Sequence, residues 1–431
     1  MAPISNRYGA LGPRDLVIWA VALGLMLLAP LVFSSSLAVT MLSQMGIAIV
    51  ACLSFNMLLG QGGMLSFGHA VYSGLGSYVA IHALKAVGGG SLGVPVSLIP
   101  LVGGVAGLGF AALLGFVTTK KSGTTFGMIT LGIGELVFAM SLMVPEFFGG
   151  EAGINANRVV GKPVMGISFG PQIQVYYLLA LYTIVCTAGM YAFTRTPLGR
   201  MLNAVRDNPE RVEFIGYNTQ RVRYLSFMIS GFFAGIAGGM YALNFEIATA
   251  EVVGAARSGA YLLFTFLGGA TFFFGPIIGA VLMVAAFVLL SEFTKAWLLY
   301  LGLIFLLMVM YAPGGIASLI MMNLRVAKFG KLGGLWSHYA LLFATGLMTF
   351  CGISAMIEMV YHLQLNEALG PVMRFMGVSL DAKATASWVG AGLVALVGMV
   401  LFEWARRRFS RQWGDVQGQI EAVLRAREAS P

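Results

Sequence analysis

Long apolar stretches, separated by short polar ones, run along almost the whole chain. A helix that crosses a bilayer needs about 20 mostly apolar residues. The sequence predicts such segments at 15–33, 38–59, 64–84, 96–118, 122–147, 172–193, 223–245, 257–271, 275–291, 296–311, 336–361 and 385–405. The strands of a membrane barrel would instead alternate in polarity over about 10 residues. The pattern therefore predicts an all-α polytopic membrane protein with about 10–12 transmembrane segments.

Two of the predicted segments, 64–84 and 257–271, contain breaks made of small and polar residues. The stretch LGQGGMLSFGHAVYSG at 59–74 is echoed by LGGATFFFGPIIGA at 267–280, with a Leu-Gly start and a later Phe-Gly pair. Many transporters build a solute site from inverted repeats whose helices are interrupted in this way. We therefore expect an inverted repeat of the core, with broken or re-entrant helices at these two places.

The first break is a candidate part of a translocation path. Backbone groups released by a helix break cannot face lipid, so they are buried in protein or line a water-filled cavity. Glycine leaves N–H groups accessible to a polar solute there, although tight helix packing through small residues is the alternative. The candidates for the path are Asn56, Gly60, Gly62, Gly63, Ser66, His69 and Glu135.

Glu135 lies near the middle of the 122–147 segment. A carboxylate at that depth is costly, and it usually faces a cavity or a partner side chain. Two interpretations stay open: Glu135 lines or gates the path, or it forms a structural hydrogen bond. His69 is a candidate partner for such a bond, and it is also a candidate for an ordinary packing residue.

The distribution of charge predicts the orientation of the chain. Charged residues make up only 10% of it, against about 25% in soluble domains. The net charge of +9 would suit nucleic acid, but the basic residues gather on one side of the predicted spans. Positive residues favour the cytoplasmic side of a membrane protein. We therefore predict that both termini are cytoplasmic and that nucleic acid is not a partner.

The sequence carries no recognisable catalytic or metal-binding motif. Cys52, Cys186 and Cys351 lie in apolar segments without metal-ligand spacing. The phosphate-binding motif G-x-x-x-x-G-K-[ST] is also missing from the sequence. We predict a protein that is not an enzyme and has no cofactor and no metal, so any ATP would be used by a partner.

The most charged internal segment, 194–227, predicts two short helices. Thr196 and Pro197 suit the cap and the first turn of one helix. Asn208 and Pro209 interrupt it, and Gly216 suits the end of a second helix. The apolar positions of the first helix recur at helical spacing: Leu198, Met201, Leu202 and Val205. Such a segment is either a docking surface or a solvated loop that orients the protein.

Four separated motifs carry a resemblance to a known family: LGQGGMLSFGHA, FGMITLGIGELVFAM, PLGRMLNAVRDNPERVEFIGYNTQRVRYLSFMISGFFAGIAGGMYA and LLFTFLGGATFFFGPIIGAVL. In this order they resemble the LivM-type permease subunits of branched-chain amino acid ABC importers, to which urea and amide permeases are close. The resemblance covers about residues 15–316. It implies a binding-protein-dependent importer that translocates branched-chain or related amino acids across the bacterial inner membrane.

The resemblance also implies the partners of the chain. They are a homologous second permease that forms a heterodimer, two cytoplasmic ATP-binding subunits, a periplasmic substrate-binding protein, and membrane lipid. In such permeases the cytoplasmic helix at 198–217 docks on the ATPase. The residues carried over to this role are Gly199, Arg200, Arg206, Asp207, Asn208, Glu213 and Gly216. Pro209 departs from the family, which usually has an acidic or small residue there.

Beyond residue 316 the resemblance stops. We expect a permease core at 1–316, an additional transmembrane hairpin at 317–405 and a basic amphipathic cytoplasmic tail at 406–431. The apolar stripe of this tail consists of Phe409, Trp413, Val416, Ile420, Val423 and Leu424. Two other functions fit part of the pattern: an ion-coupled secondary transporter of a small polar solute, and a membrane scaffold that transports nothing.

Overall fold

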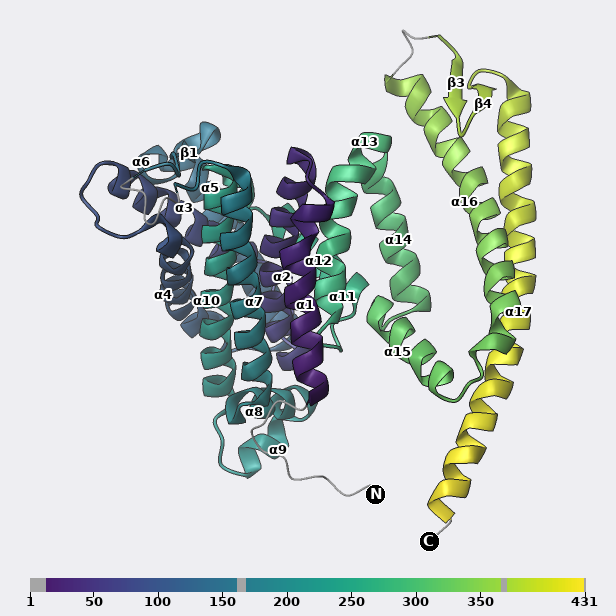
Figure 1. The fold of residues 1–431 in the computed structure, drawn as a ribbon, viewed down its shortest axis with the longest axis horizontal. Coiled ribbons are helices and arrows are strands. Elements are labelled where there is room, and N and C mark those ends of the chain that lie inside the picture. Colours follow the sequence, from purple (N-terminus) through teal and green to yellow (C-terminus); the bar gives the residue numbers. More distant parts are fainter. Residues whose placement is uncertain (1–12, 161–167, 366–369, 430–431) are drawn as a thin grey trace. The chain divides into compact units, whose positions relative to one another are not determined.

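The computed structural model describes residues 13–160, 168–365 and 370–429, and this part of the chain is nearly all helical (Figure 1). Eight of its helices are long and apolar enough to cross a membrane: Ser36–Gly62, Val96–Thr118, Gly123–Met143, Gln172–Arg195, Thr219–Phe245, Gly275–Phe293, Leu332–Leu365 and Thr385–Arg425. A ninth span forms if the bent pair α14 (Trp297–Tyr311) and α15 (Gly315–Lys328) counts as one. The predicted class, an all-α polytopic membrane protein, is confirmed.

The remaining predicted crossings form three further helices. The first segment forms α1 (Pro13–Val32), which has 20 residues and is apolar over Val17–Val32. The two segments with predicted breaks form α3 (Ala70–Gly88) and α11 (Ala255–Gly268), which do not reach the length and apolarity of a full span. Residues 1–12 and 430–431 lie outside the described residues, so the side on which each terminus lies stays a prediction.

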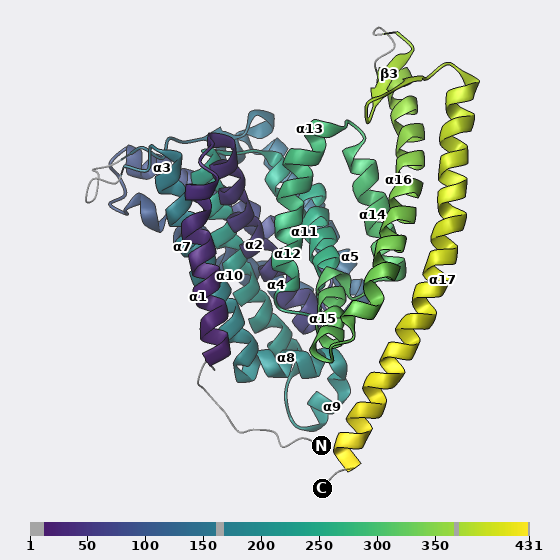
Figure 2. The ribbon, with the colours of Figure 1, turned by 45° about the vertical axis from the view of Figure 1, so that its right-hand side comes forward.

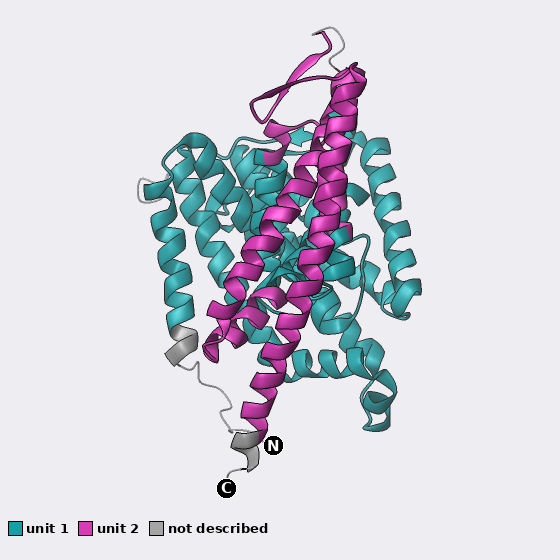
Figure 3. Cartoon of the chain, turned by 90° about the vertical axis from the view of Figure 1, so that its right-hand side faces the viewer, with its two compact units in different colours: residues 1–289, 307–317 teal, residues 290–306, 318–431 magenta. Residues whose placement is uncertain are grey.

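The chain divides into two compact units (Figure 3): residues 1–289 with 307–317, and residues 290–306 with 318–431. Unit 1 contains α1 to α12, which include α2 (Ser36–Gly62), α4 (Ile99–Thr118), α5 (Gly123–Met143), α7 (Gln172–Arg195), α10 (Thr219–Phe245) and α12 (Gly275–Ala285). Its short elements are η1 (Val96–Leu98), α6 (Pro145–Phe148), η2 (Gly150–Ala152), β1 (Ile154–Asn155), β2 (Ile247–Ala248) and η3 (Ala250–Val253). β1 and β2 pair antiparallel, with Ile154 opposite Ala248.

Helix α10 is the centre of unit 1, where it packs against α4, α3 and α2. On its α4 side small residues recur every four positions on both helices: Gly231, Gly235 and Gly239 face Gly103, Gly107 and Ala111. A Cβ atom at Gly107 would lie 2.3 Å from the carbonyl oxygen of Gly231. Because lipid is as apolar as leucine, helices in membranes associate through such close packing of small residues.

The third backbone in this centre belongs to α3. A Cβ atom at Gly238 of α10 would lie 1.8 Å from the carbonyl oxygen of Ser73, and one at Gly76 would lie 2.7 Å from Cα of Gly235. No side chain fits at either contact. The backbones of the three helices therefore touch directly. These contacts fix the position of α10 along α3 and α4.

Both glycine-rich stretches form helix breaks. The first ends α2 at Gly63, whose φ of 63° is left-handed, and the chain continues without regular helix until α3 begins at Ala70. The second ends α11 at Gly269, whose φ is 112°, and α12 begins at Gly275. Glycine adopts such positive φ values without the steric cost of a side chain. The predicted breaks are therefore confirmed.

The two breaks are not related by inversion where they meet. Helix α11 lies along α2, and the contacts advance in the same direction: Thr265 donates a hydrogen bond to the carbonyl of Cys52 at 3.5 Å, and Ala270 meets Gly60. Helices α2 and α11 are thus parallel, and both breaks lie at the same end. The short echo of small residues therefore does not place these two breaks at opposite ends, and an inverted repeat of the core as a whole stays a prediction.

Unit 2 contains a pair of antiparallel helices, α16 (Trp336–Leu365) and α17 (Thr385–Ala429), joined by the hairpin of β3 (Val372–Phe375) and β4 (Val378–Asp381). Close contacts at Gly352 with Ala395 and at Gly398 with Thr349 set the register of the two helices. The other elements of this part are α13 (Ser291–Phe293), most of α14 and α15, and η5 (Leu332–Leu335). The π-helical turn η4 (Ala286–Leu290) lies where unit 1 passes into unit 2.

The C-terminal stripe packs within unit 2. Val416 and Ile420 are buried against Val326 and Leu335, and Phe409 and Trp413 stack beside them. The stripe therefore covers an apolar surface of its own chain, while Val423 stays 42% exposed.

We predict that Gly107→Ala destabilises the protein by about 1–3 kcal/mol, which is typical of overpacking, because the new Cβ atom collides with the carbonyl of Gly231. The measurement is the melting temperature of the purified protein in detergent. The matched control is Gly109→Ala on the same helix, where nothing lies within 4 Å of the new atom. Equal melting temperatures for the two variants would contradict the role given to the glycine contact.

Candidate functional site

The charged segment between α7 and α10 forms two short helices at one end of unit 1 (Figure 2), α8 (Pro197–Asp207) and α9 (Pro209–Phe214). The Thr196 hydroxyl accepts a hydrogen bond from the Gly199 amide at 3.1 Å and caps α8. The Asn208 side chain accepts one from the Arg211 amide at 3.0 Å and caps α9. A side-chain oxygen at the N-cap satisfies amides that have no partner in the first turn. The helix–break–helix predicted from the sequence is confirmed.

Helix α8 packs on the end of α2, at the first glycine break. The Asn203 amide donates to the Gln61 side-chain oxygen at 2.8 Å, and the Arg206 guanidinium donates to the carbonyl of Gly60. Leu202 covers Gly62, where a Cβ atom would lie 3.1 Å from the leucine methyl. Two polar bonds and one apolar contact therefore join α8 to the break.

The other residues carried over from the family shape the two short helices. Gly199 is buried, because a Cβ atom there would lie 2.2 Å from the carbonyl of Phe193. Asp207 pairs with Arg206 at 2.9 Å, and Glu213 accepts a hydrogen bond from the Thr219 hydroxyl at 2.7 Å. Gly216, with a φ of 90°, ends the segment, and the side chain of Arg200 is exposed.

Large apolar side chains at the end of α9 are open to the surroundings. Phe214 is 88% exposed, Ile215 is 67% exposed and Tyr217 is 52% exposed. Exposed apolar patches with polar edges mark interaction sites more often than chance would place them. This apolar patch was not among the features predicted from the sequence, although the residues Phe-Ile-Gly-Tyr stand together in the chain.

The residues predicted for the path fall into separate places. Gly60, Gly62 and Gly63 lie against α8 or the second break, as the contacts of Arg206, Leu202 and Ala270 show. Asn56 and Ser66 are buried, and within the described part of the chain the side-chain oxygen of each has no hydrogen-bond partner.

His69 and Glu135 do not meet. The His69 ring is buried between Phe55 and Tyr72, and its Nε2 atom lies 3.0 Å from the Ser54 hydroxyl. Glu135 lies on the exposed face of α5. The pairing suggested from the sequence is wrong, and its source is plain, because the sequence alone does not give the rotation of α5.

The irregular segment between α2 and α3 is held by side chains of distant helices. The Phe67 amide donates to Thr130 on α5 at 3.1 Å, and the Ala70 amide donates to Ser258 on α11 at 3.0 Å. Backbone groups outside a helix at membrane depth need such partners, because lipid offers none. The break is therefore built into a contact of α2, α5 and α11.

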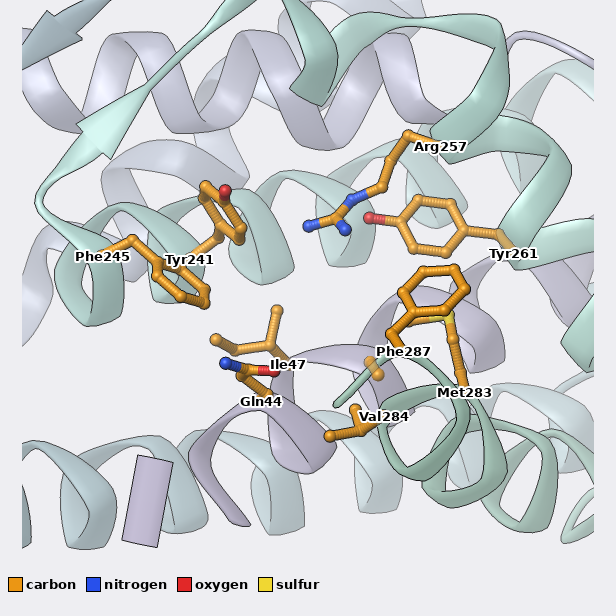
Figure 4. A pocket seen from close by; sticks show the side chains of 10 residues that line it. Gln44, Ile47, Tyr241, Phe245, Arg257, Tyr261, Met283, Val284 and Phe287 are labelled. Atoms are coloured by element: carbon orange, nitrogen blue, oxygen red, sulfur yellow. The ribbon is translucent and has the colours of Figure 1, made fainter. Parts of the chain in front are cut away.

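A cavity of about 130 Å³ lies beside α2, α10, α11 and α12 (Figure 4). Its polar groups are Arg257 from the first turn of α11, Tyr261 one turn later, Tyr241 near the end of α10, and Gln44 on α2. The guanidinium carbon of Arg257 lies 5.1 Å from the ring centre of Tyr241 and 5.9 Å from that of Tyr261. A cation over aromatic faces at these distances is held by a cation–π interaction.

None of these four residues was among the candidates predicted from the sequence. The available signal was Arg257, a cation within an apolar segment, which by default indicates a functional site. Tyr241 and Gln44 come from helices far away in the chain, so only the fold brings them to the arginine.

Comparison with known proteins gives a family and several relatives. Residues 37–312 match the sequence model described as "Branched-chain amino acid transport system / permease component". The chain is 28% identical over 313 residues to the high-affinity branched-chain amino acid transport system permease protein LivM of Salmonella typhimurium, covering 67% of this chain and 71% of the relative. It is 26% identical over 312 residues to LivM of Escherichia coli, with the same coverage.

A third relative has a different cargo in its name. The guanosine ABC transporter permease protein NupQ of Bacillus subtilis is 28% identical over 155 residues, which cover 34% of this chain and 44% of the relative. No solved structure gives a significant match to the chain. The family match extends over more than half of the chain and includes both breaks, α8, α9 and the cavity. The chain therefore belongs to the family of branched-chain amino acid transport system permease components.

Proposed function

We propose that this chain is one permease subunit of a binding-protein-dependent ABC importer in a bacterial inner membrane. It would form a heterodimer with a homologous permease, dock on two cytoplasmic ATP-binding subunits and receive its cargo from a periplasmic binding protein. The observation that carries the proposal is the joint between α8 and the first break, made by Arg206 with Gly60 and by Asn203 with Gln61. The permease itself hydrolyses no ATP in this account.

The helices α8 and α9 are the proposed contact with the ATPase. Their exposed apolar residues, Phe214 and Ile215, would enter a groove of that subunit, while Arg206 faces back into the permease. In this arrangement, α8 and α9 would contact the ATPase on one side, and α8 contacts the end of α2 on the other. This arrangement also assigns α8 and both termini to the cytoplasmic side, in agreement with the positive-inside rule.

Movement of the ATPases would reach the transmembrane helices through this joint. Closure on ATP would displace α8, and α8 would carry Gly60 to Gly63 and the end of α2 with it. Alternating access requires two global states with different contacts at the site that is driven. The end of α2 would bend at the glycine break. Because the glycines there have no side chains, such a bend would not push a side chain into the neighbouring helices.

Glu135 is the proposed path residue among the sequence candidates. Its carboxylate is on the exposed face of α5, and lipid contact would be costly for it. We infer that this face of α5 meets the second permease across a water-filled path. The glycines at 60, 62 and 63 would act on transport through α8 rather than by contact with the solute, while His69 would hold the start of α3 against Ser54 of α2. Asn56 and Ser66, whose buried side-chain oxygens have no partner in the described part of the chain, stay candidates for the path.

The proposed cargo is a branched-chain or related amino acid. The family description and the names of two relatives state this class, while the guanosine permease shows that related permeases carry other solutes. An ion-coupled secondary transporter is the second candidate, and the exposed carboxylate of Glu135 is the observation that favours it. Such a transporter would have no use for an ATPase, so copurification separates the two.

We predict that Arg206→Glu uncouples the complex. The substitution removes a charge-assisted hydrogen bond to Gly60, worth about 1.5–3 kcal/mol, and adds a carboxylate beside a carbonyl. ATP hydrolysis stimulated by the binding protein and an amino acid should fall about 10-fold to 100-fold in proteoliposomes. The control is Lys85→Glu, an exposed charge reversal near the end of α3.

Wild-type complex that purifies without an ATPase and moves solute only down an ion gradient would reject the importer. Full stimulation of ATP hydrolysis in Arg206→Glu, with Lys85→Glu also active, would reject the coupling role of the contact between α8 and α2, but not the importer.

We predict that Phe214→Asp and Ile215→Asp abolish copurification of the ATPase subunits, because each places a charge in the apolar docking patch. The permease alone should remain folded, since both side chains are exposed. The measurement is the ratio of ATPase to permease after affinity purification. Val159→Asp, another exposed apolar position, is the control. An unchanged ratio in both α9 variants would contradict the docking surface.

A further inference from the structure

The cavity around Arg257 contains a positive charge without a negative partner. Among the residues that the structure describes, no carboxylate forms an ion pair with Arg257. The residue is half-buried, and its guanidinium lies between the rings of Tyr241 and Tyr261, with the Tyr261 hydroxyl beside it (Figure 4). A guanidinium has five N–H donors in a planar fork, and two aromatic rings leave donors available.

The planar shape of the Arg257 guanidinium determines which anions it binds best. An arginine fork matches a carboxylate or a phosphate through two parallel N–H···O bonds, which are stronger than neutral hydrogen bonds. The helix that carries Arg257 is also anchored, because Ser258, the next residue of α11, accepts the hydrogen bond of the Ala70 amide at 3.0 Å. A donor group on an anchored helix loses little entropy when it binds.

The rest of the lining is apolar apart from one amide. Ile47, Phe245, Met283, Val284 and Phe287 surround the space that the guanidinium faces, and the Gln44 carboxamide lies on the opposite side of it (Figure 4). A phosphate ester or a sugar would bring more polar groups than these walls can satisfy, and unsatisfied polar groups are expensive to bury. A solute with one carboxylate and a small aliphatic body fits the lining.

The volume agrees with a solute of that size. The cavity measures about 130 Å³, and a protein cavity of about 150 Å³ holds a benzene molecule. A small aliphatic solute therefore matches the cavity better than a nucleoside, which is much larger.

A second, smaller space continues past Arg257 and Tyr241 between α3 and α10. It measures about 10 Å³ and is lined by Ser73 and Ser77. The Ser77 side chain is 1% exposed, and its hydroxyl has no hydrogen-bond partner within the described part of the chain. A space of this volume holds about one water molecule. The unpartnered hydroxyl is thus a second polar group close to the guanidinium and available to a ligand or its water.

We propose that this cavity is a recognition site for the carboxylate of the transported solute, in which Arg257 binds the carboxylate and the apolar walls receive a small aliphatic body. The inference rests on the proposed transport function and deepens it by naming the place in this chain, and the residue Arg257, that would bind the carboxylate of a small aliphatic cargo. It separates this chain from permeases of uncharged nucleosides. The site lies toward the end of α10 that is remote from α8, where a solute released by the binding protein would arrive first.

The test is equilibrium binding of radiolabelled L-valine to the purified permease–ATPase complex without the binding protein. Isovalerate, which has the carboxylate and the aliphatic body, should displace valine. Valinamide, which lacks the carboxylate, and guanosine should not. Arg257→Gln should weaken valine binding about 10-fold to 100-fold, since a charge-assisted bidentate contact is lost.

Three further variants separate recognition from folding. Arg257→Lys keeps the charge but loses the fork, so its valine affinity should lie between wild type and Arg257→Gln. Tyr261→Phe removes only the hydroxyl beside the guanidinium and should weaken binding to a smaller extent than Arg257→Gln. Lys85→Gln removes an exposed charge elsewhere and should bind as wild type. Basal ATP hydrolysis, measured on every variant, reports assembly of the complex.

Wild-type affinity for valine in Arg257→Gln, displacement by valinamide as effective as by isovalerate, or no saturable binding of valine to the wild-type complex would each overturn the site. These results would leave the proposed function intact as long as the complete system, with its binding protein, imports a solute on ATP. Absence of any ATP-driven import would instead reject the proposed function.

Discussion

The fold of unit 1 depends on backbone contact between α10 and its neighbours α4 and α3. Glycines at 103, 107, 231, 235 and 238 bring carbonyl oxygens to positions that a Cβ atom would occupy, so the helices cannot slide or rotate past one another without losing these contacts. In lipid no hydrophobic force between helices replaces such packing. These contacts hold α10 in place against α3 and α4. The α8–α9 segment precedes α10 at Thr219, and the cavity lies at its other end, at Tyr241.

A second helix connects the same two places. Helix α2 lines the cavity with Gln44 and Ile47 and, about 20 Å further along at 1.5 Å per residue, meets α8 at Gly60 to Gly63. Its far end is built differently, because the helix stops at a left-handed glycine and is followed by irregular chain that Thr130 and Ser258 hold by hydrogen bonds. Helix α10 is therefore packed closely along its length, whereas α2, which is bonded to α10 through Ser54 and Ser230, ends at the contact with α8. In the proposed mechanism, α8 would move the end of α2 relative to α10, and the cavity lies between these two helices.

Local patterns in the sequence predicted the helices and their breaks well, but not the contacts between them. Apolar length gave the spans, glycine and polar residues gave both breaks, and Thr196 with Asn208 gave the caps of α8 and α9, because each of these signals acts over a few residues. Four features could be seen only in the fold. The bond of Asn203 with Gln61 joins residues 142 positions apart. The parallel course of α2 and α11 and the exposure of Glu135 depend on direction and rotation, which apolar composition does not encode. The sequence also does not show that Arg257 lies beside Tyr241, which comes from a different helix.

If α8 acts on the cavity through α2, the accessibility of Gln44, which lines the cavity, changes when ATP binds. Cys52, Cys186 and Cys351 are replaced by alanine, Gln44 is replaced by cysteine, and the rate of labelling by a membrane-impermeant thiol reagent is measured in the reconstituted complex with and without ATP. The account predicts a rate that changes with nucleotide, and loss of that change when Arg206 is replaced by glutamate. A labelling rate that is the same with and without ATP would contradict the coupling of the cavity to the cytoplasmic helices.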